Sequence, residues 1–185
     1  FKGDWSSDVC SSDLFLMPLD LRQFSGSHEA VVSELLAKAG LEEYAALDEA
    51  ARIRVLLREL ATPRLLYSPY LQYSAETQKE LAIFREAARI QAAFGQDAIG
   101  QSIMSNCASV SDILELALTL KETGLIRLVD GQPVASLNLV PLFEMIADLD
   151  ADGEMMDALF ALPWYPLLLR SRGVMQEVML GDSDR

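Results

Sequence analysis

The chain has 185 residues, a formal net charge of −13 and a hydrophobic fraction of 51%. This length suffices for one domain with a substantial core, and the hydrophobic fraction excludes a chain disordered by charge. The acidic balance argues against a nucleic acid or an anionic membrane surface as partner. No apolar run approaches the roughly 18 residues that a membrane-spanning helix needs. Two cysteines cannot form a disulfide framework, so we expect a cytoplasmic protein.

Residues 1–14, FKGDWSSDVCSSDL, show neither helical nor strand periodicity. The stretch resembles translated sequencing-adapter contamination, and we interpret it as a non-native, disordered leader. The chain ends with GDSDR, directly after an apolar run that would be expected to continue. We therefore expect residues 15–185 to form one domain that is truncated at both ends.

Hydrophobic spacing and capping residues predict six helices. Gly40, Gly95 and Gly124 follow three of them as stop signals, and Ser109 with Asp112 has the pattern of a capping box at the start of another. The expected helices span residues 27–39, 48–61, 74–94, 109–123, about 147–161 and 163–171.

Short apolar runs between these helices have the length of strands. They span residues 15–21, 99–104, 137–143 and 177–180. Each run is nearly continuous rather than alternating, which is typical of strands covered on both faces. Strands that alternate with helices predict parallel β/α units, and the long interval between residues 21 and 99 predicts additional helices.

Polar residues that could bind a ligand or take part in catalysis follow each predicted strand. Arg22 follows the first, Ser105-Asn106 the second, Glu144 the third, and Asp182 with Asp184 the fourth. Parallel β/α folds carry their chemistry at the carboxyl ends of strands. Carboxylates without a partnering His or Cys suit a hard cation, Mg²⁺ or Mn²⁺, and an arginine suits a phosphate or carboxylate. The pattern predicts a metal-assisted site for a small phosphorylated acid.

Each of these residues, taken alone, also has an ordinary structural interpretation. Arg22 fits a surface ion pair equally well. Glu144 fits a helix N-terminus, and Asp182 and Asp184 fit a turn; for these three the structural interpretation is favoured when they are considered singly. His28, the one histidine, is better interpreted as a structural or surface residue than as a catalytic base.

Four stretches, in this order and spacing, resemble the phosphoenolpyruvate carboxylase family over residues 15–185. They are PLDLRQFSGSHEAVVSELL from Pro18, SIMSNCASVSDILELALTLKETGL from Ser102, LNLVPLFEMIADL from Leu137 and LPWYPLLLRSRGVMQEVMLGDSD from Leu162. The resemblance implies a helix-rich α/β fold: part of a (β/α)₈ TIM-type barrel of the phosphoenolpyruvate/pyruvate kind, with additional helices.

The resemblance also implies an activity and roles for matching residues. The family joins phosphoenolpyruvate to bicarbonate, giving oxaloacetate and phosphate, a carboxy-lyase reaction of anaplerotic carbon fixation that uses Mg²⁺ or Mn²⁺. Glu144 matches the Glu of P-L-F-E and Asp184 the Asp of G-Y-S-D, both metal ligands. Arg22 matches the Arg of D-[IL]-R-Q, which binds substrate. Asp182 stands where the family has Tyr. The full-length parent is expected to be a homotetramer.

Parts of the family pattern are absent from this sequence. They are the T-A-H-P-T-E segment with the catalytic His, the Lys beyond the last motif, and the glycine- and arginine-rich loop. No complete set of catalytic residues is therefore expected in this chain, and we expect the isolated chain to be inactive. Two alternatives stay open: a non-catalytic, acidic helical interaction domain, and another phosphoenolpyruvate or pyruvate barrel enzyme.

Overall fold

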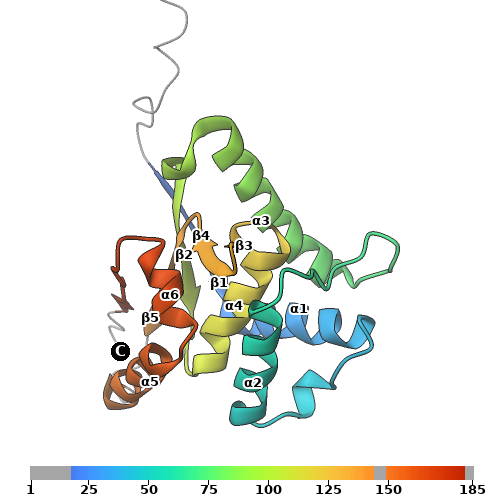
Figure 1. The fold of residues 1–185 in the computed structure, drawn as a ribbon, viewed down its shortest axis with the longest axis horizontal. Helices are drawn as coiled ribbons and strands as arrows, with labels where there is room; N and C mark the ends of the chain where they lie inside the picture. Colours follow the sequence, from blue (N-terminus) through green and yellow to red (C-terminus); the bar gives the residue numbers. More distant parts are fainter. Residues whose placement is uncertain (1–17, 144–148, 182–185) are drawn as a thin grey trace, which may run out of the picture.

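The structure is a computed structural model that describes residues 18–143 and 149–181, and its helices surround a parallel sheet (Figure 1). The six predicted helices are all present, with ends within two residues of those expected. They are α1 (Ser25–Lys38), α2 (Glu49–Leu60), α3 (Ala75–Phe94), α4 (Val110–Glu122), α5 (Leu149–Ala161) and α6 (Tyr165–Arg170); two short 3₁₀ turns, η1 (Tyr44–Ala46) and η2 (Gln96–Ala98), follow α1 and α3.

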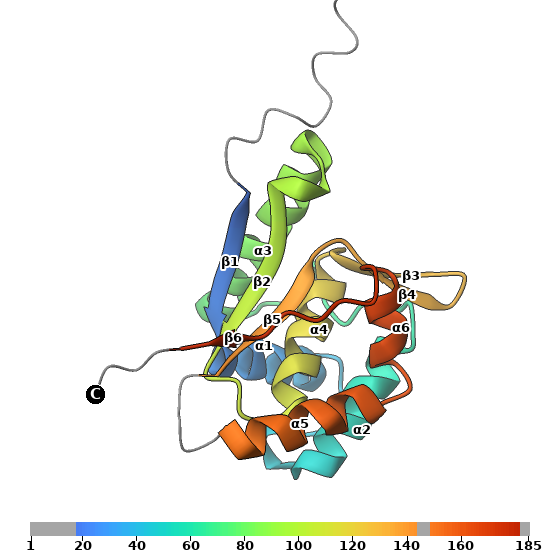
Figure 2. The same cartoon turned by 90° about the vertical axis from the view of Figure 1, so that its left-hand side faces the viewer.

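The sheet contains four parallel strands in the order in which they occur along the chain. These are β1 (Leu19–Phe24), β2 (Ile99–Ser105), β5 (Asn138–Phe143) and β6 (Met179–Leu180). Figure 2 shows β1, β2 and β5 side by side, with α3 and α1 on one side of the sheet. The chain is thus a helix-rich α/β protein with a parallel sheet, as predicted at that level of description.

The two faces of the sheet differ in their surroundings. On one face, side chains such as Met104 and Leu139 belong to the main hydrophobic core beneath the helices. On the other face, a separate cluster contains only Ile103, Val140 and Leu142 among the described residues. β5 is buried along most of its length, whereas β1 and β6 are largely exposed. The expectation that every strand is covered on both faces is therefore wrong for β1 and β6.

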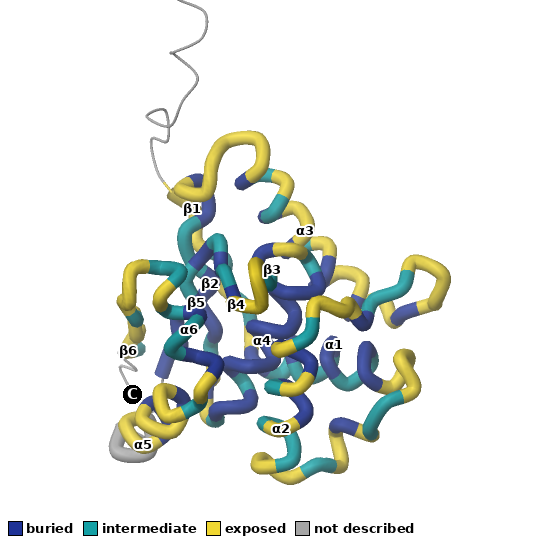
Figure 3. The backbone as a smooth tube through the Cα atoms, in the orientation of Figure 1, coloured by how far each residue is buried: buried dark blue, intermediate teal, exposed yellow. Residues whose placement is uncertain are grey.

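Helix α4 lies at the centre of the helical layer and is buried along nearly its whole length (Figure 3). It contacts α1, α2, α3, α5, β3 and β5. The predicted capping box at its start is present, with the Ser109 and Asp112 side chains each accepting from the other's backbone N–H.

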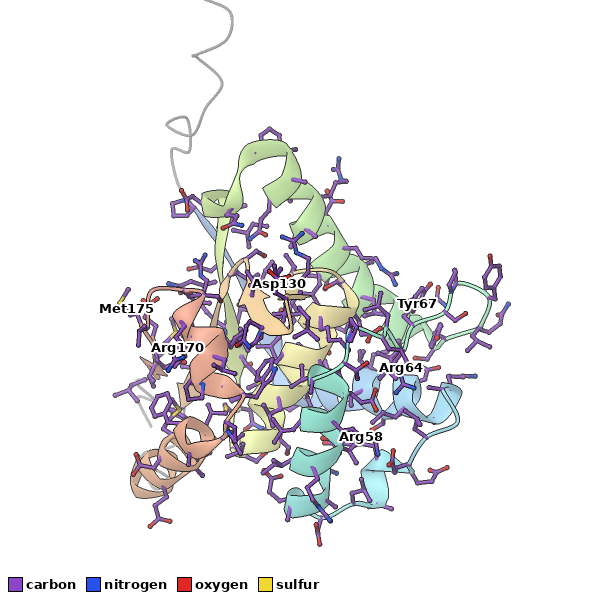
Figure 4. All side chains as sticks on the ribbon, viewed as in Figure 1. Arg58, Arg64, Tyr67, Asp130, Arg170 and Met175 are labelled. Carbon is purple, nitrogen blue, oxygen red and sulfur yellow. The ribbon has the colours of Figure 1, made fainter. Side chains whose placement is uncertain are left out.

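The end of α4 anchors the connection between α2 and α3. Lys121 Nζ donates to the carbonyl oxygens of Glu59 and Arg64, at 2.7 and 2.6 Å. The Glu122 carboxylate accepts from the backbone N–H groups of Leu66 and Tyr67, at 2.9 and 2.8 Å. Figure 4 shows the side chains of Arg64 and Tyr67 at this connection. The charges of Lys121 and Glu122 therefore both have main-chain partners, which offsets the cost of removing them from water.

A β-hairpin that the sequence analysis did not predict lies between α4 and β5. Its strands are β3 (Ile126–Val129) and β4 (Gln132–Ala135). The two residues that join them, Asp130 and Gly131, both have positive φ, 50° and 76°. Asp-Gly between two short apolar runs is the usual signal for such a turn, because its twist matches that of the flanking strands.

Replacing Gly131 by Ala should destabilise the protein by about 1 kcal/mol, because a Cβ disfavours the left-handed conformation even where space is free. Gly153→Ala is the matched control. Gly153 lies in α5 with ordinary φ and open space around it, so the same substitution should stabilise by about 0.5–1 kcal/mol. Urea unfolding measures both changes. Equal effects of the two substitutions would contradict this account of the turn.

Candidate functional site at the carboxyl edge of the sheet

The carboxyl ends of all four parallel strands meet at one edge. Phe24 at the end of β1 pairs with Ser105 at the end of β2, and Phe143 at the end of β5 pairs with Leu180 at the end of β6. The backbone N–H of Gly181 donates to the carbonyl oxygen of Phe143 at 2.7 Å, which continues the pairing beyond β6. This edge is where ligands bind in parallel α/β sheets.

Arg22, the predicted substrate-binding residue, lies on β1 two residues before the end of the strand and is exposed. It is in register with Ile103, which is in turn in register with Val140. Because neighbours in a parallel register share a face, Arg22 lies on the sheet face opposite the main core.

The two predicted metal ligands, Glu144 and Asp184, lie outside the described residues. The described residues nearest to them in sequence, Phe143 and Gly181, are joined by the hydrogen bond given above. Within 18–143 and 149–181, no group of three or more His, Cys, Asp or Glu side chains is placed to hold a metal ion.

Two serine side chains connect the ends of β1 and β2. Ser25 Oγ donates to the carbonyl oxygen of Asn106 at 2.8 Å, and Ser105 Oγ donates to that of Gln23 at 3.2 Å. Asn106 adopts a left-handed conformation with φ of 55°, which costs a non-glycine residue about 1 kcal/mol. Ser105-Asn106 was predicted to lie at this edge from the sequence, whereas Ser25 was not, because its only signal is its place directly after β1.

His28 has a structural role. Its ring is fully buried in α1, with its centroid 5.8 Å from that of Phe84 in α3. Burial lowers the pKa of His28 to about 4, so the ring is neutral near pH 7. This agrees with the interpretation of His28 as a structural residue.

A second cluster of buried polar groups joins η1, α2 and α4 beneath the surface. The Tyr44 hydroxyl donates to Glu115 Oε1 at 2.6 Å, and an Arg52 nitrogen lies 3.9 Å from the same oxygen. Burial raises the pKa of Glu115 to about 8, with the Tyr44 hydrogen bond acting in the opposite direction. Arg52 also pairs with Glu29 at 2.7 Å and lies over the Tyr44 ring. Arg52 Nε also donates to the main-chain carbonyl oxygen of Leu47 at 3.2 Å, so the cluster ties η1, α2 and α4 together and is structural.

Glu115→Gln should change the pH dependence of stability in a defined direction. Folded Glu115 keeps its proton up to about pH 8, so its contribution to stability is present at low pH and is lost as pH rises towards 8. Relative to the variant, the wild-type free energy of unfolding should fall by about 1 kcal/mol per pH unit between about pH 5 and pH 8.

His28→Leu provides the opposite case for comparison. The unfolded histidine binds a proton that the folded one excludes, so stability is lost as pH falls from 6.5 towards about 4. Urea unfolding between about pH 4 and pH 8 measures both variants. A pH profile of Glu115→Gln that runs parallel to the wild type would contradict the assignment of Glu115.

The fold and the edge together define a parallel α/β protein with its candidate ligand site at the carboxyl ends of the strands, the arrangement common among enzymes of this class. The model of the phosphoenolpyruvate carboxylase family matches residues 4–185. The chain therefore belongs to the phosphoenolpyruvate carboxylase family.

Three relatives named phosphoenolpyruvate carboxylase illustrate the similarity. The protein of Chromobacterium violaceum is 72% identical over 170 residues, which are 92% of this chain and 19% of the relative. That of Aromatoleum aromaticum is 54% identical over 91% of this chain and 18% of the relative. That of Azorhizobium caulinodans is 51% identical over 95% of this chain and 19% of the relative. The chain thus spans about a fifth of the length of these relatives.

Among the described helices, none combines the length and the apolar character required to cross a membrane.

Proposed function

We propose that this chain is a segment of an enzyme that carboxylates phosphoenolpyruvate with bicarbonate to give oxaloacetate and phosphate. The observation that carries the proposal is the family match over residues 4–185. It is supported by the placement of Arg22 near the strand-end edge, where the chemistry of a parallel α/β protein takes place.

We assign Glu144 and Asp184 as ligands of a divalent cation, Mg²⁺ or Mn²⁺. Both offer carboxylate oxygens, the donors that hard cations prefer. Each follows a strand of the sheet closely: Glu144 comes directly after β5, and Asp184 comes three residues after Gly181. When bound, the cation would supply positive charge beside the phosphate and the developing enolate.

Arg22 would hold the phosphate or the carboxylate of the substrate through paired N–H groups. Its side chain is exposed on the sheet face opposite the helices, so it can bind an anion without displacing core residues. Neutralising that charge and fixing its orientation would favour the transfer of phosphate to bicarbonate and the capture of CO₂ by the enolate.

The sheet face that carries Arg22 would line the interior of a TIM-type barrel completed by the rest of the polypeptide. The consecutive order of β1, β2, β5 and β6 is the order that such a barrel requires. The small cluster of Ile103, Val140 and Leu142 would form part of the barrel interior. Catalysis would then need residues contributed from outside this chain, so the isolated chain would be inactive.

The metal-ligand assignment predicts different results for two neighbouring aspartates. In a full-length carboxylase that carries residues 15–185 of this chain, Asp184→Asn should lower the rate of oxaloacetate formation at least about hundredfold, because one metal ligand is lost. Asp182→Asn is the matched control and should retain most of the activity, since Asp182 has no assigned ligand role.

The measurement is bicarbonate- and Mn²⁺-dependent oxaloacetate formation, followed by its reduction with a coupled dehydrogenase. Glu144→Gln should reproduce the loss, and Arg22→Gln should raise KM for phosphoenolpyruvate. Full activity in Asp184→Asn and Glu144→Gln would reject the assignment and favour a non-catalytic role for this segment.

A further inference from the structure

The sheet face opposite the main core changes in character along the strands. Near the middle of the strands, Ile103 and Val140 are neighbours in the register and belong to one small apolar cluster. Two residues nearer the amino ends, the side chains on the same face are all polar, and they form a row of Asp20, Gln101 and Asn138. In Figure 2 the amino ends of β1 and β2 lie at the top of the sheet. This face is therefore apolar in the middle and polar at its amino end.

Two members of the polar row have partners within the chain. Gln101 Nε2 donates to Glu177 Oε2 at 2.5 Å, and Arg172 Nε donates to Asn138 Oδ1 at 2.8 Å. Glu177 and Arg172 both lie on the segment between α6 and β6. These contacts account for the two amides of the row, but not for its carboxylate.

The third member, Asp20, lies on β1, which is an edge strand of the described sheet, and it is exposed there. Among the residues that the structure describes, none forms a hydrogen bond or an ion pair with its carboxylate. A cleft of about 350 Å³ opens beside Asp20 and is also lined by Asp97 and Arg172. Of the described residues that line this cleft, two are acidic and one is basic, and the basic residue already donates to Asn138. The cleft is therefore suited to a further positive charge.

The proposed barrel gives this charge distribution a consequence. In such a barrel the face that carries Asp20 is turned inward, where branched apolar side chains usually fill the space. A carboxylate that loses contact with water is costly unless a positive charge and hydrogen bonds compensate it. The chain spans about a fifth of the length of its relatives, so the strand that pairs with the free edge of β1 comes from the rest of the polypeptide. That strand is the nearest source of a compensating side chain.

We infer that the Asp20 carboxylate forms an ion pair with a lysine or arginine side chain from the part of the full-length protein that this chain does not include. The basic residue would lie on the strand that pairs with the free edge of β1, and it would occupy the cleft beside Asp20. The inference rests on the barrel described under the proposed function. Asp20 touches neither metal nor substrate in this assignment; it joins this segment to the rest of the barrel at the amino end.

The first test is the crystal structure of the full-length carboxylase that carries residues 15–185. A nitrogen of a lysine or arginine from outside these residues should lie within about 4 Å of an Asp20 carboxylate oxygen. An Asp20 carboxylate that contacts only water, an inorganic cation, Arg172 or apolar side chains would overturn the inference. This test needs no variant, so it decides the matter even if a substitution at Asp20 prevents folding.

The second test is amide hydrogen exchange in the same protein. Asp20→Asn should accelerate exchange of the β1 amides about tenfold or more, because it leaves an inward-facing positive charge without its partner. Asp97→Asn is the matched control. Asp97 lines the same cleft but lies in η2, outside the sheet, so its replacement should leave β1 unaffected. Unchanged exchange in Asp20→Asn, or equal acceleration in both variants, would contradict the ion pair.

The outcomes separate this inference from the proposed function. If the full-length protein forms oxaloacetate and Asp20 has no basic partner, only the inference about Asp20 fails. If it forms no oxaloacetate from phosphoenolpyruvate and bicarbonate, the proposed activity fails, and the crystal structure still decides the ion pair. A structure in which no strand pairs with the free edge of β1 would overturn both the barrel and the inference.

Discussion

Helix α4 lies at the centre of the helices that cover the sheet, with nearly all of its side chains buried. Burial of this kind is favourable only if the polar groups it removes from water find partners. Glu115 accepts a hydrogen bond from the Tyr44 hydroxyl. Lys121 and Glu122 form hydrogen bonds with main-chain groups at the end of α2 and in the connection between α2 and α3. In the sequence, α4 lies between β2 and the hairpin that precedes β5. The placement of α4 therefore affects how β2 and β5 pair. The carboxyl edge of the sheet depends on that pairing.

The parallel arrangement brings chemistry from distant parts of the sequence to one edge. Arg22 belongs to β1, and β5 and β6, which precede Glu144 and Asp184, end beside each other through the Phe143–Gly181 hydrogen bond. Packing secures β5, which is buried on both faces, but it secures β6 poorly. Precision at the exposed end of the sheet must therefore come from directed polar contacts, such as those of Ser25 and Ser105.

The helices could be predicted closely because their apolar faces and caps are local signals. Ser109 and Asp112 mark the start of α4, and Gly124 follows its end. The hairpin was not predicted, although Asp130-Gly131 is a typical turn signal. Its two strands, β3 and β4, have only four residues each, which is too short for a clear strand pattern. The first strand was expected at the apolar run of residues 15–21 and was expected to be buried. The described strand is β1, Leu19–Phe24, and its position at the edge of the described sheet exposes it. Contacts such as that of Gln101 with Glu177 join elements far apart in sequence, so no local pattern could reveal them. Of the predicted site residues, the described structure places Arg22.

We propose that Glu144 and Asp184 bind a divalent cation. The most direct measurement is the anomalous scattering of Mn²⁺ in crystals of the full-length carboxylase that carries this segment. We predict a peak coordinated by Glu144 and Asp184, within reach of the anion held by Arg22. A peak bound by other residues, with Glu144 and Asp184 both outside its coordination shell, would contradict the account.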